Sequence, residues 1–149
     1  MNLILSSKAA KKLQIEEHLI KDFTPDIDTW RVDCASLVKE SIFIITNETT
    51  LYTCISSCKN GFGGIIQKIA SASIKDTLDV SDINYVKLQN RSIVSSMNNI
   101  KQIISQLDKY NPSSNETYEK SINQTPFKHL SFGTPAEMHS FNMSSRLVD

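Results

Sequence analysis

The sequence predicts an α+β domain in which helices pack on a small, mostly antiparallel sheet. Three observations support this fold class. Two segments rich in β-branched residues flank a short polar connection, apolar residues recur at helical spacing over 92–109, and the composition is that of an ordinary globular protein. The chain has 149 residues, of which 40% are hydrophobic and 21% charged, and this length suits one core.

The first part of the chain predicts two strands with a helix between them. Residues 2–5 suit a short strand, and Ser7 is placed to cap a helix that extends to about residue 14. Proline and aspartate at 24–26 favour a turn. Residues 29–34 alternate between apolar and polar side chains, which predicts a half-buried strand.

Residues 41–46 and 51–56 predict an antiparallel hairpin, because both are rich in β-branched and aromatic residues and the connection between them is short and polar. Within 41–46 the apolar residues occupy both faces, with Phe43 and Ile45 on one and Ile42 and Ile44 on the other. We therefore expect this strand to be central in the sheet, with helices covering at least one face.

Further helices and one strand follow. Residues 61–73 show helical spacing of apolar residues, 85–88 suggest a short strand, and 92–109 predict a long amphipathic helix that packs on the sheet. We expect residues 1–110 to form the α+β core domain and residues 111–149 to form a loop-rich C-terminal extension that packs partly on it. Thr134, Pro135 and Glu137 suggest one helix start in this extension, and residues 141–149 are expected to be mobile.

Charge and cysteine content restrict the function classes. The formal net charge is +0 at pH 7, so no global field favours nucleic acid or an anionic membrane, although a local patch is not excluded. Lysines interrupt the apolar start of the chain, and no segment reaches the roughly 20 apolar residues of a transmembrane helix. The spacing of Cys34, Cys54 and Cys58 fits neither a redox nor a zinc motif. We expect three reduced thiols in a cytoplasmic protein.

No complete enzyme signature is found in the sequence. Residues 61–64 are rich in glycine but lack the features of a phosphate-binding or dinucleotide-binding loop, so they predict a flexible entry to a helix. His129 and His139 are interpreted as surface or tail histidines, with a metal or acid/base pair as the alternative. We expect no metal and no cofactor, and we lean against an enzyme while leaving that question open.

The strongest site candidate is the predicted start of the long helix, at Asn90, Arg91 and Ser92. A helix start offers unpaired N–H groups, and an arginine there can add a bidentate fork for a phosphate or carboxylate. The structural alternative is that Asn90 or Ser92 caps the helix while Arg91 pairs with Asp33 or Glu48 to lock the helix to the sheet.

The hairpin connection is included in the candidate site. Asn98 lies on the same long helix, and its side chain is expected to hydrogen-bond the hairpin at Asn47, next to Glu48, with Asn99 as a second candidate donor. This contact suits a structural role better than a catalytic one.

Several of these residues also carry a resemblance. In order, they are Lys8-Ala-Ala-Lys-Lys-Leu13, Trp30, Thr46-Asn47-Glu48 with Leu51-Tyr52, Asn90-Arg91-Ser92-Ile93-Val94, and Asn123 with Thr125-Pro126. The chain resembles a bacterial family of small domains of unknown function, family 6933 in the domain-of-unknown-function series, over about residues 1–135. The family pattern Gly-Ser-Met-Asn-Asp is Ser95-Ser96-Met97-Asn98-Asn99 here, without the acid. The resemblance implies a shared fold and supplies no activity.

The sequence therefore favours a small cytoplasmic interaction module without catalysis, which binds a protein partner or a small anionic ligand near Arg91. The alternative is an enzyme that acts on a phosphate-containing or nucleic-acid substrate, with Arg91 as an anion clamp. Asp33, Glu48 or His129 would then supply the acid or base. A nucleic-acid binder is disfavoured because the net charge is zero and arginines are not interleaved with aromatic residues.

Overall fold

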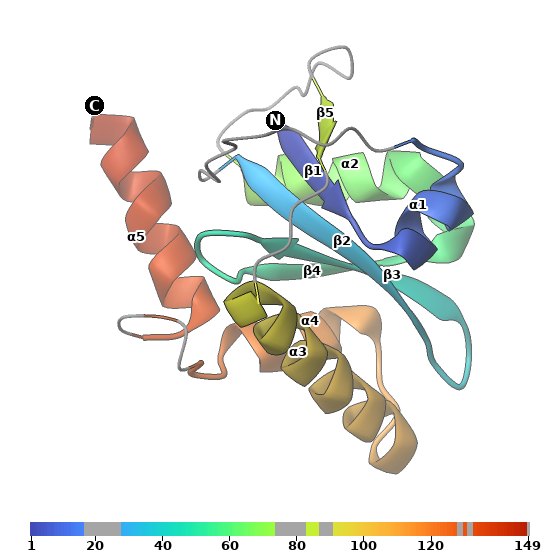
Figure 1. Ribbon diagram of the computed structural model, residues 1–149. Helices are drawn as coiled ribbons and strands as arrows, with labels where there is room; N and C mark the ends of the chain where they lie inside the picture. Colours follow the sequence, from blue (N-terminus) through green and yellow to red (C-terminus); the bar gives the residue numbers. More distant parts are fainter. Residues whose placement is uncertain (17–27, 74–82, 87–90, 128–129, 131–132, 149) are drawn as a thin grey trace.

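Five strands form one sheet in the computed structural model, which describes residues 1–16, 28–73, 83–86, 91–127, 130 and 133–148 (Figure 1). The predicted strands are all present, although residues 87 and 88 of the last one, and the turn predicted at 24–26, lie outside the described residues. The strands, in the spatial order β4-β3-β2-β1-β5, are β1 (Asn2–Leu5), β2 (Thr29–Ser36), β3 (Ser41–Asn47), β4 (Thr53–Ser57) and β5 (Asn84–Val86).

The sheet is mixed. β3 is antiparallel to both β2 and β4, as the hairpin prediction requires, whereas β1 is parallel to both β2 and β5. The antiparallel pairs are the longer ones, so most paired residues of the described sheet are antiparallel, as expected, but the sequence did not indicate the two parallel pairs. A hairpin has a local signature in its short connection, but a parallel pair joins segments that are distant in the sequence and has none.

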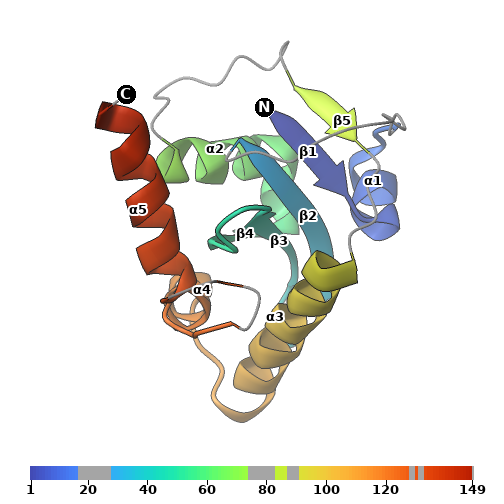
Figure 2. The ribbon, with the colours of Figure 1, turned by 60° about the vertical axis from the view of Figure 1, so that its left-hand side comes forward.

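Helices cover both faces of the sheet (Figures 1 and 2). This three-layer arrangement confirms the α+β class and the long helix expected at 92–109. The helices α1 (Ser7–Leu13) and α2 (Gly61–Ala72) lie on one face, α3 (Arg91–Tyr110) and α4 (Asn115–Asn123) lie on the other, and α5 (Pro135–Val148) lies beside the turn between β3 and β4. No helix among the described residues is long and apolar enough to span a membrane.

Each face of the sheet has its own hydrophobic core. The first core lies under α1 and α2 and includes Trp30, Ile65 and Ile69; the second lies under α3 and α4 and includes Ile104 and Ile122. Strand β3 supplies both cores, because Phe43 and Ile45 face the first while Ile42 and Ile44 face the second. The expectation of a central, covered strand is confirmed, and the covering is on both faces.

Strand β2 is more deeply buried than the alternation of apolar and polar residues predicted. Trp30, Val32 and Cys34 are buried in the first core, as expected. Arg31 on the opposite side is also buried, at 9% exposure, because α3 and α4 cover that face. A polar residue in an alternating strand thus need not face solvent when a second layer of helices lies above it.

Helix starts follow the expected capping chemistry. The α1 cap is Ser6 rather than Ser7: its Oγ accepts the N–H of Ala9 at 3.1 Å. At α5, Thr134 accepts the N–H of Glu137, as the sequence indicated. Gly64 is not merely part of a flexible entry to α2, because a Cβ there would lie 2.6 Å from atoms of Asn60 and Ser56. Glycine allows α2 to approach β4 closely.

Residues 111–149 contain two helices rather than mainly loops. The α5 start at Pro135 was expected; the helix continues to Val148, through residues that we expected to be mobile, and side chains beyond residue 141 lie outside the description. The α4 helix was not expected, because most of its residues are polar. Its two buried apolar residues, Tyr118 and Ile122, one turn apart, complete the second core.

Helix α4 also closes the edge of the sheet along β4. The Asn123 side chain acts like the peptide group of another strand: its Oδ1 accepts the N–H of Thr53, and its Nδ2 donates to the Thr53 carbonyl, both at 2.8 Å. Glu119 accepts the N–H of Ile55 in the same way at 2.6 Å. Three backbone polar groups of this edge strand are thereby satisfied within the chain.

Candidate functional site

The predicted site at the start of α3 lies largely beyond the described side chains. Asn90 is outside the described residues, and Arg91 and Ser92 begin α3 as expected, but their side chains are not described. The anion or partner site at Arg91 therefore stays a prediction.

The two acids considered as partners of Arg91 have described partners of their own. Glu48 accepts two hydrogen bonds from Arg31, from Nη2 at 3.0 Å and from Nε at 3.1 Å, and both side chains are buried. Asp33 accepts from the Lys101 ammonium at 3.0 Å. Because Lys101 belongs to α3, a lock between this helix and the sheet is present, but it is made through Lys101.

Asn47 has a structural role in the hairpin. Its Oδ1 accepts the N–H groups of Thr49 and Thr50, both at 3.0 Å, and its side chain is fully buried. Asn98 is exposed on α3, and no hydrogen bond joins it to Asn47 in the described part of the chain. The expected contact is wrong, because Asn98 and the second candidate, Asn99, are both exposed on α3.

His139 is a buried residue, which corrects its interpretation as a surface or tail histidine; His129 lies outside the described residues. The His139 Nε2 donates to the carbonyl of Ala72, the last residue of α2, at 2.8 Å. Since a carbonyl can only accept, Nδ1 is the acceptor for the Thr50 hydroxyl, at 2.9 Å. The ring stacks on Tyr52, with ring centroids 4.6 Å apart, and meets Trp30 edge-on.

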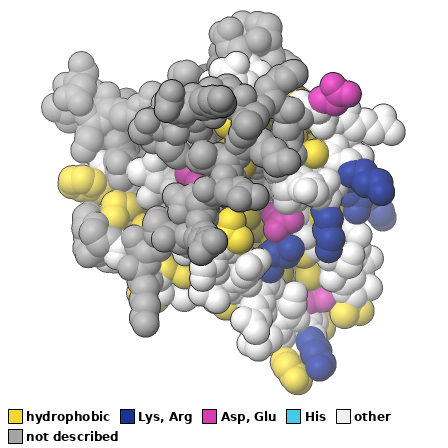
Figure 3. Space-filling view, in the orientation of Figure 1, with side chains coloured by type: hydrophobic (Ala, Val, Ile, Leu, Met, Phe, Trp, Pro, Cys, Tyr) yellow, Lys and Arg dark blue, Asp and Glu magenta, His cyan; other side chains and the backbone are white. Residues whose placement is uncertain are grey.

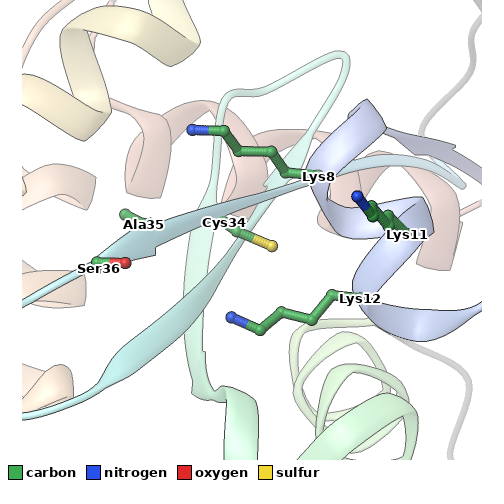
Figure 4. Close-up of a pocket in the computed structure, with 6 residues that line it drawn as sticks. All are labelled: Lys8, Lys11, Lys12, Cys34, Ala35 and Ser36. Atoms are coloured by element: carbon green, nitrogen blue, oxygen red, sulfur yellow. The ribbon is translucent and has the colours of Figure 1, made fainter.

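Among the described residues, a candidate for ligand binding is a cavity of about 330 Å³ beside α1 (Figure 4). Three lysines from α1 and three residues from the end of β2 line it. We call it the lysine pocket; its lining residues are Lys8, Lys11, Lys12, Cys34, Ala35 and Ser36. Figure 3 shows that lysine and arginine side chains gather on the side of the molecule where α1 lies. The pocket thus has a local positive charge in a chain with no net charge.

The sequence brings these lysines together through helical geometry. Residues 8, 11 and 12 have the i, i+3 and i+4 spacing of one helix face. Ala9 and Leu13 point into the first core and hold α1 against the sheet. The pocket lies at the carboxyl ends of the parallel strands β1 and β2, the end of a parallel sheet where open α/β folds bind their ligands.

The pocket has no negative charge of its own. No carboxylate among the described residues lies within 4.0 Å of the three lysine ammonium groups. Burial raises the pKa of the Cys34 thiol to about 11, so this thiol is neutral at pH 7. Burial also raises the pKa of the nearby Cys58 thiol, and this effect exceeds the lowering by Lys12, the largest opposing influence. Among the described residues, the three positive charges are therefore left without a negatively charged partner.

Sequence reasoning missed this pocket. It treated Lys8, Lys11 and Lys12 only as residues that interrupt an apolar start and as part of a resemblance. The i, i+3, i+4 spacing is a signal that could have placed them on one face. What could not be read from the sequence is that α1 lies beside the end of β2, because that follows from the parallel pairing of β1 and β2.

Neither a metal site among the described residues nor a match to a known protein suggests another function for this chain. Within the described ranges, no group of three or more His, Cys, Asp or Glu side chains is arranged to hold a metal ion. Neither a family model nor a curated protein matches the chain. The resemblance to the bacterial family of small domains therefore stays a prediction.

Proposed function

We propose that this protein is a non-catalytic binding domain that takes an anionic ligand in the lysine pocket. The observation that carries the proposal is that three lysines line one cavity of about 330 Å³ without a carboxylate partner among the described residues. Positive charges that line one cavity repel each other, and an anion that enters the pocket reduces this repulsion.

The position of the pocket supports the proposal. All three lysines are on α1, whose opposite side is held in the first core, so the helix presents them from a rigid support. Lys68 of α2 is paired with Glu119 of α4, and Lys101 of α3 with Asp33 of β2. The lysines of the pocket have no such acid partner among the described residues, which favours a ligand as their partner.

The proposal also covers the cellular compartment of the protein and the family to which it belongs. All three cysteines of the chain are free thiols, the pattern of a reducing compartment, and this supports a cytoplasmic protein. We further propose membership of the small bacterial family that the sequence resembles, on the strength of the motifs around Asn47 and the start of α3. Binding of a protein partner or ligand near Arg91 remains a separate prediction.

No observation on the described residues favours the enzyme alternative. It needs an acid or base that converges with an anion clamp. Asp33 and Glu48 are each held in an ion pair, with Lys101 and Arg31, and neither lines the lysine pocket. We therefore retain the binding domain as the conclusion.

Thermal unfolding with and without anions tests the proposal. We expect diphosphate or citrate to raise the Tm of the wild type by a few degrees at ligand concentrations well above Kd, because ligands that bind only the folded state stabilise it. The double variant Lys8→Ala/Lys12→Ala should lose this shift. Lys109→Ala is the control, since it removes an exposed lysine from the far end of α3.

Two results would contradict the proposal. One is the absence of any Tm shift for the wild type with either anion. The other is an equal loss of the shift in Lys8→Ala/Lys12→Ala and in Lys109→Ala, which would indicate a general surface effect rather than a pocket. Measuring at two salt concentrations adds a check, because binding to exposed lysines should weaken as screening increases.

A further inference from the structure

We infer that the lysine pocket selects a short phosphate chain, such as diphosphate or the phosphates of a nucleoside diphosphate, over carboxylate ligands and over the nucleobase. This inference rests on the proposed function and narrows it to one ligand class. It is carried by three features of the lining residues: the kind of cation, the number of charges and the absence of aromatic side chains among them.

The kind of cation favours phosphate. Arginine offers a planar fork that matches a carboxylate or a phosphate with two parallel hydrogen bonds, whereas lysine is a point charge with three rotatable donors. The described lining contains three lysines and no arginine. Separate point charges suit a ligand whose oxygens point in several directions, as the non-bridging oxygens of a phosphate chain do.

The number of charges favours more than one phosphate. A single phosphomonoester carries about −1.5 to −2 at pH 7, which leaves part of three lysine charges uncompensated. The Cys34 thiol does not offset them, because it stays protonated at this pH. A chain of two or more phosphates supplies further negative charge and further acceptor oxygens within the same cavity.

The pocket is small, and its described lining offers no aromatic surface on which a base could stack. About 330 Å³ is near the lower end of the roughly 300–1,000 Å³ of small-molecule sites. Bases are commonly held by stacking on aromatic side chains, and none of the six lining residues is aromatic. Cys34 and Ser36 add only small neutral donors. A nucleotide would therefore bind through its phosphates, with its base outside the pocket.

Isothermal titration calorimetry with a matched set of probes tests this inference. The probes are orthophosphate, diphosphate, tripolyphosphate, citrate, ADP and adenosine. We expect the Kd for diphosphate to be at least tenfold lower than that for citrate, which corresponds to about 1.4 kcal/mol. ADP should bind within about threefold of diphosphate, orthophosphate should bind more weakly, and adenosine should show no heat of binding.

Lysine variants and the NMR signals of individual residues test whether the ligand binds in the pocket. Lys8→Ala/Lys12→Ala should weaken diphosphate binding by at least tenfold, Lys12→Arg should retain most of it because the charge remains, and Lys109→Ala should match the wild type. In ¹H–¹⁵N spectra, diphosphate should shift the amide signals of Lys12 and Ser36 and leave that of Lys109 unchanged.

Each result that contradicts these expectations overturns one part of the inference. Equal affinity for citrate and diphosphate would overturn phosphate selectivity while leaving anion binding intact. ADP that binds much more tightly than diphosphate would show base contacts and overturn the exclusion of the base. A single-stranded oligonucleotide that displaces diphosphate at lower concentration than ADP would show that the phosphates of a nucleic acid are the ligand. If no anion binds, the proposed function itself fails.

Discussion

Arg31 and Glu48 form an ion pair that joins β2 to the turn after β3, with both side chains nearly inaccessible to solvent. The two hydrogen bonds, at 3.0 and 3.1 Å, use the planar fork of the guanidinium. Removing two charges from water is costly, and the cost is offset only while both partners are present. Each of the two charged side chains is therefore stable in its buried position only while the other is present.

We predict that Glu48→Ala lowers the free energy of unfolding by about 3–5 kcal/mol, because it leaves the Arg31 guanidinium buried without its partner. Urea unfolding monitored by circular dichroism measures this. The double variant Arg31→Met/Glu48→Leu is the control: it removes both charges and should recover most of the loss. If the single and double variants lose the same stability, the packing of the side chains, and not the unpaired charge, is what matters.

The Arg31–Glu48 pair also shows that sequence patterns do not reveal which distant side chains contact each other. Glu48 was a candidate site residue because it is near the hairpin, and Arg31 was assigned to a polar strand face. That they contact each other depends on the β2–β3 register, in which Arg31 lies opposite Thr46, two residues before Glu48. Lys101 and Asp33 likewise meet only because α3 packs across β2. Such pairs are properties of the tertiary arrangement and have no local signature.

At the scale of elements, prediction succeeded where the signal was local. The β3–β4 hairpin has β-branched strands and a short polar connection, and the α3 helix has strong periodicity; both were expected within two residues of their observed bounds. The α4 helix was missed because only Tyr118 and Ile122 mark its buried face. Its capping by Ser114, which accepts the N–H of Thr117 at 3.2 Å, is a local signal that could have indicated it.

Helix α5 is attached through His139, which reaches into a site between α2 and the β3–β4 turn. Both ring nitrogens have partners there, the Ala72 carbonyl and the Thr50 hydroxyl, and the ring stacks on Tyr52. Burial lowers the pKa of His139 below its usual value of 6.5, although the hydrogen bond to Ala72 opposes this. The folded state thus holds a neutral imidazole, and a proton on this ring disfavours the docked helix.

We predict that the free energy of unfolding falls as the pH decreases through about 6.5, because His139 takes up a proton more readily in the unfolded chain than in the folded one. The contribution is complete above the unfolded pKa and is lost as the pH falls towards the lower folded pKa. Urea unfolding of the wild type and of His139→Gln between pH 8 and pH 5 measures it. The difference between the two curves should shrink on the acidic side; a constant difference would exclude a role for protonation. Tyr52 does not contribute in this range, because burial raises its pKa above 10.0.

At the scale of the whole molecule, one sheet separates two hydrophobic cores that share the strand β3. The first core contains Trp30, the only tryptophan of the chain, and the second contains Ile122 of α4. The sequence suggested a division at residue 110, with the remainder packing only partly on the core. The burial of Tyr118 and Ile122 against β3 and β4 favours one cooperative unit, because the second core is incomplete without α4.

Ile122→Ala tests this cooperativity across the sheet. Removing a fully buried isoleucine should cost about 2–5 kcal/mol, through lost apolar burial and the cavity left behind. If the chain unfolds as one unit, the urea midpoint measured by Trp30 fluorescence in the first core should fall together with the midpoint measured by far-ultraviolet circular dichroism. Ile69→Ala, in the first core, is the matched control and should shift both probes in the same way. A Trp30 midpoint that stays at the wild-type value in Ile122→Ala, while the helical signal falls earlier, would show that residues 111–149 unfold separately.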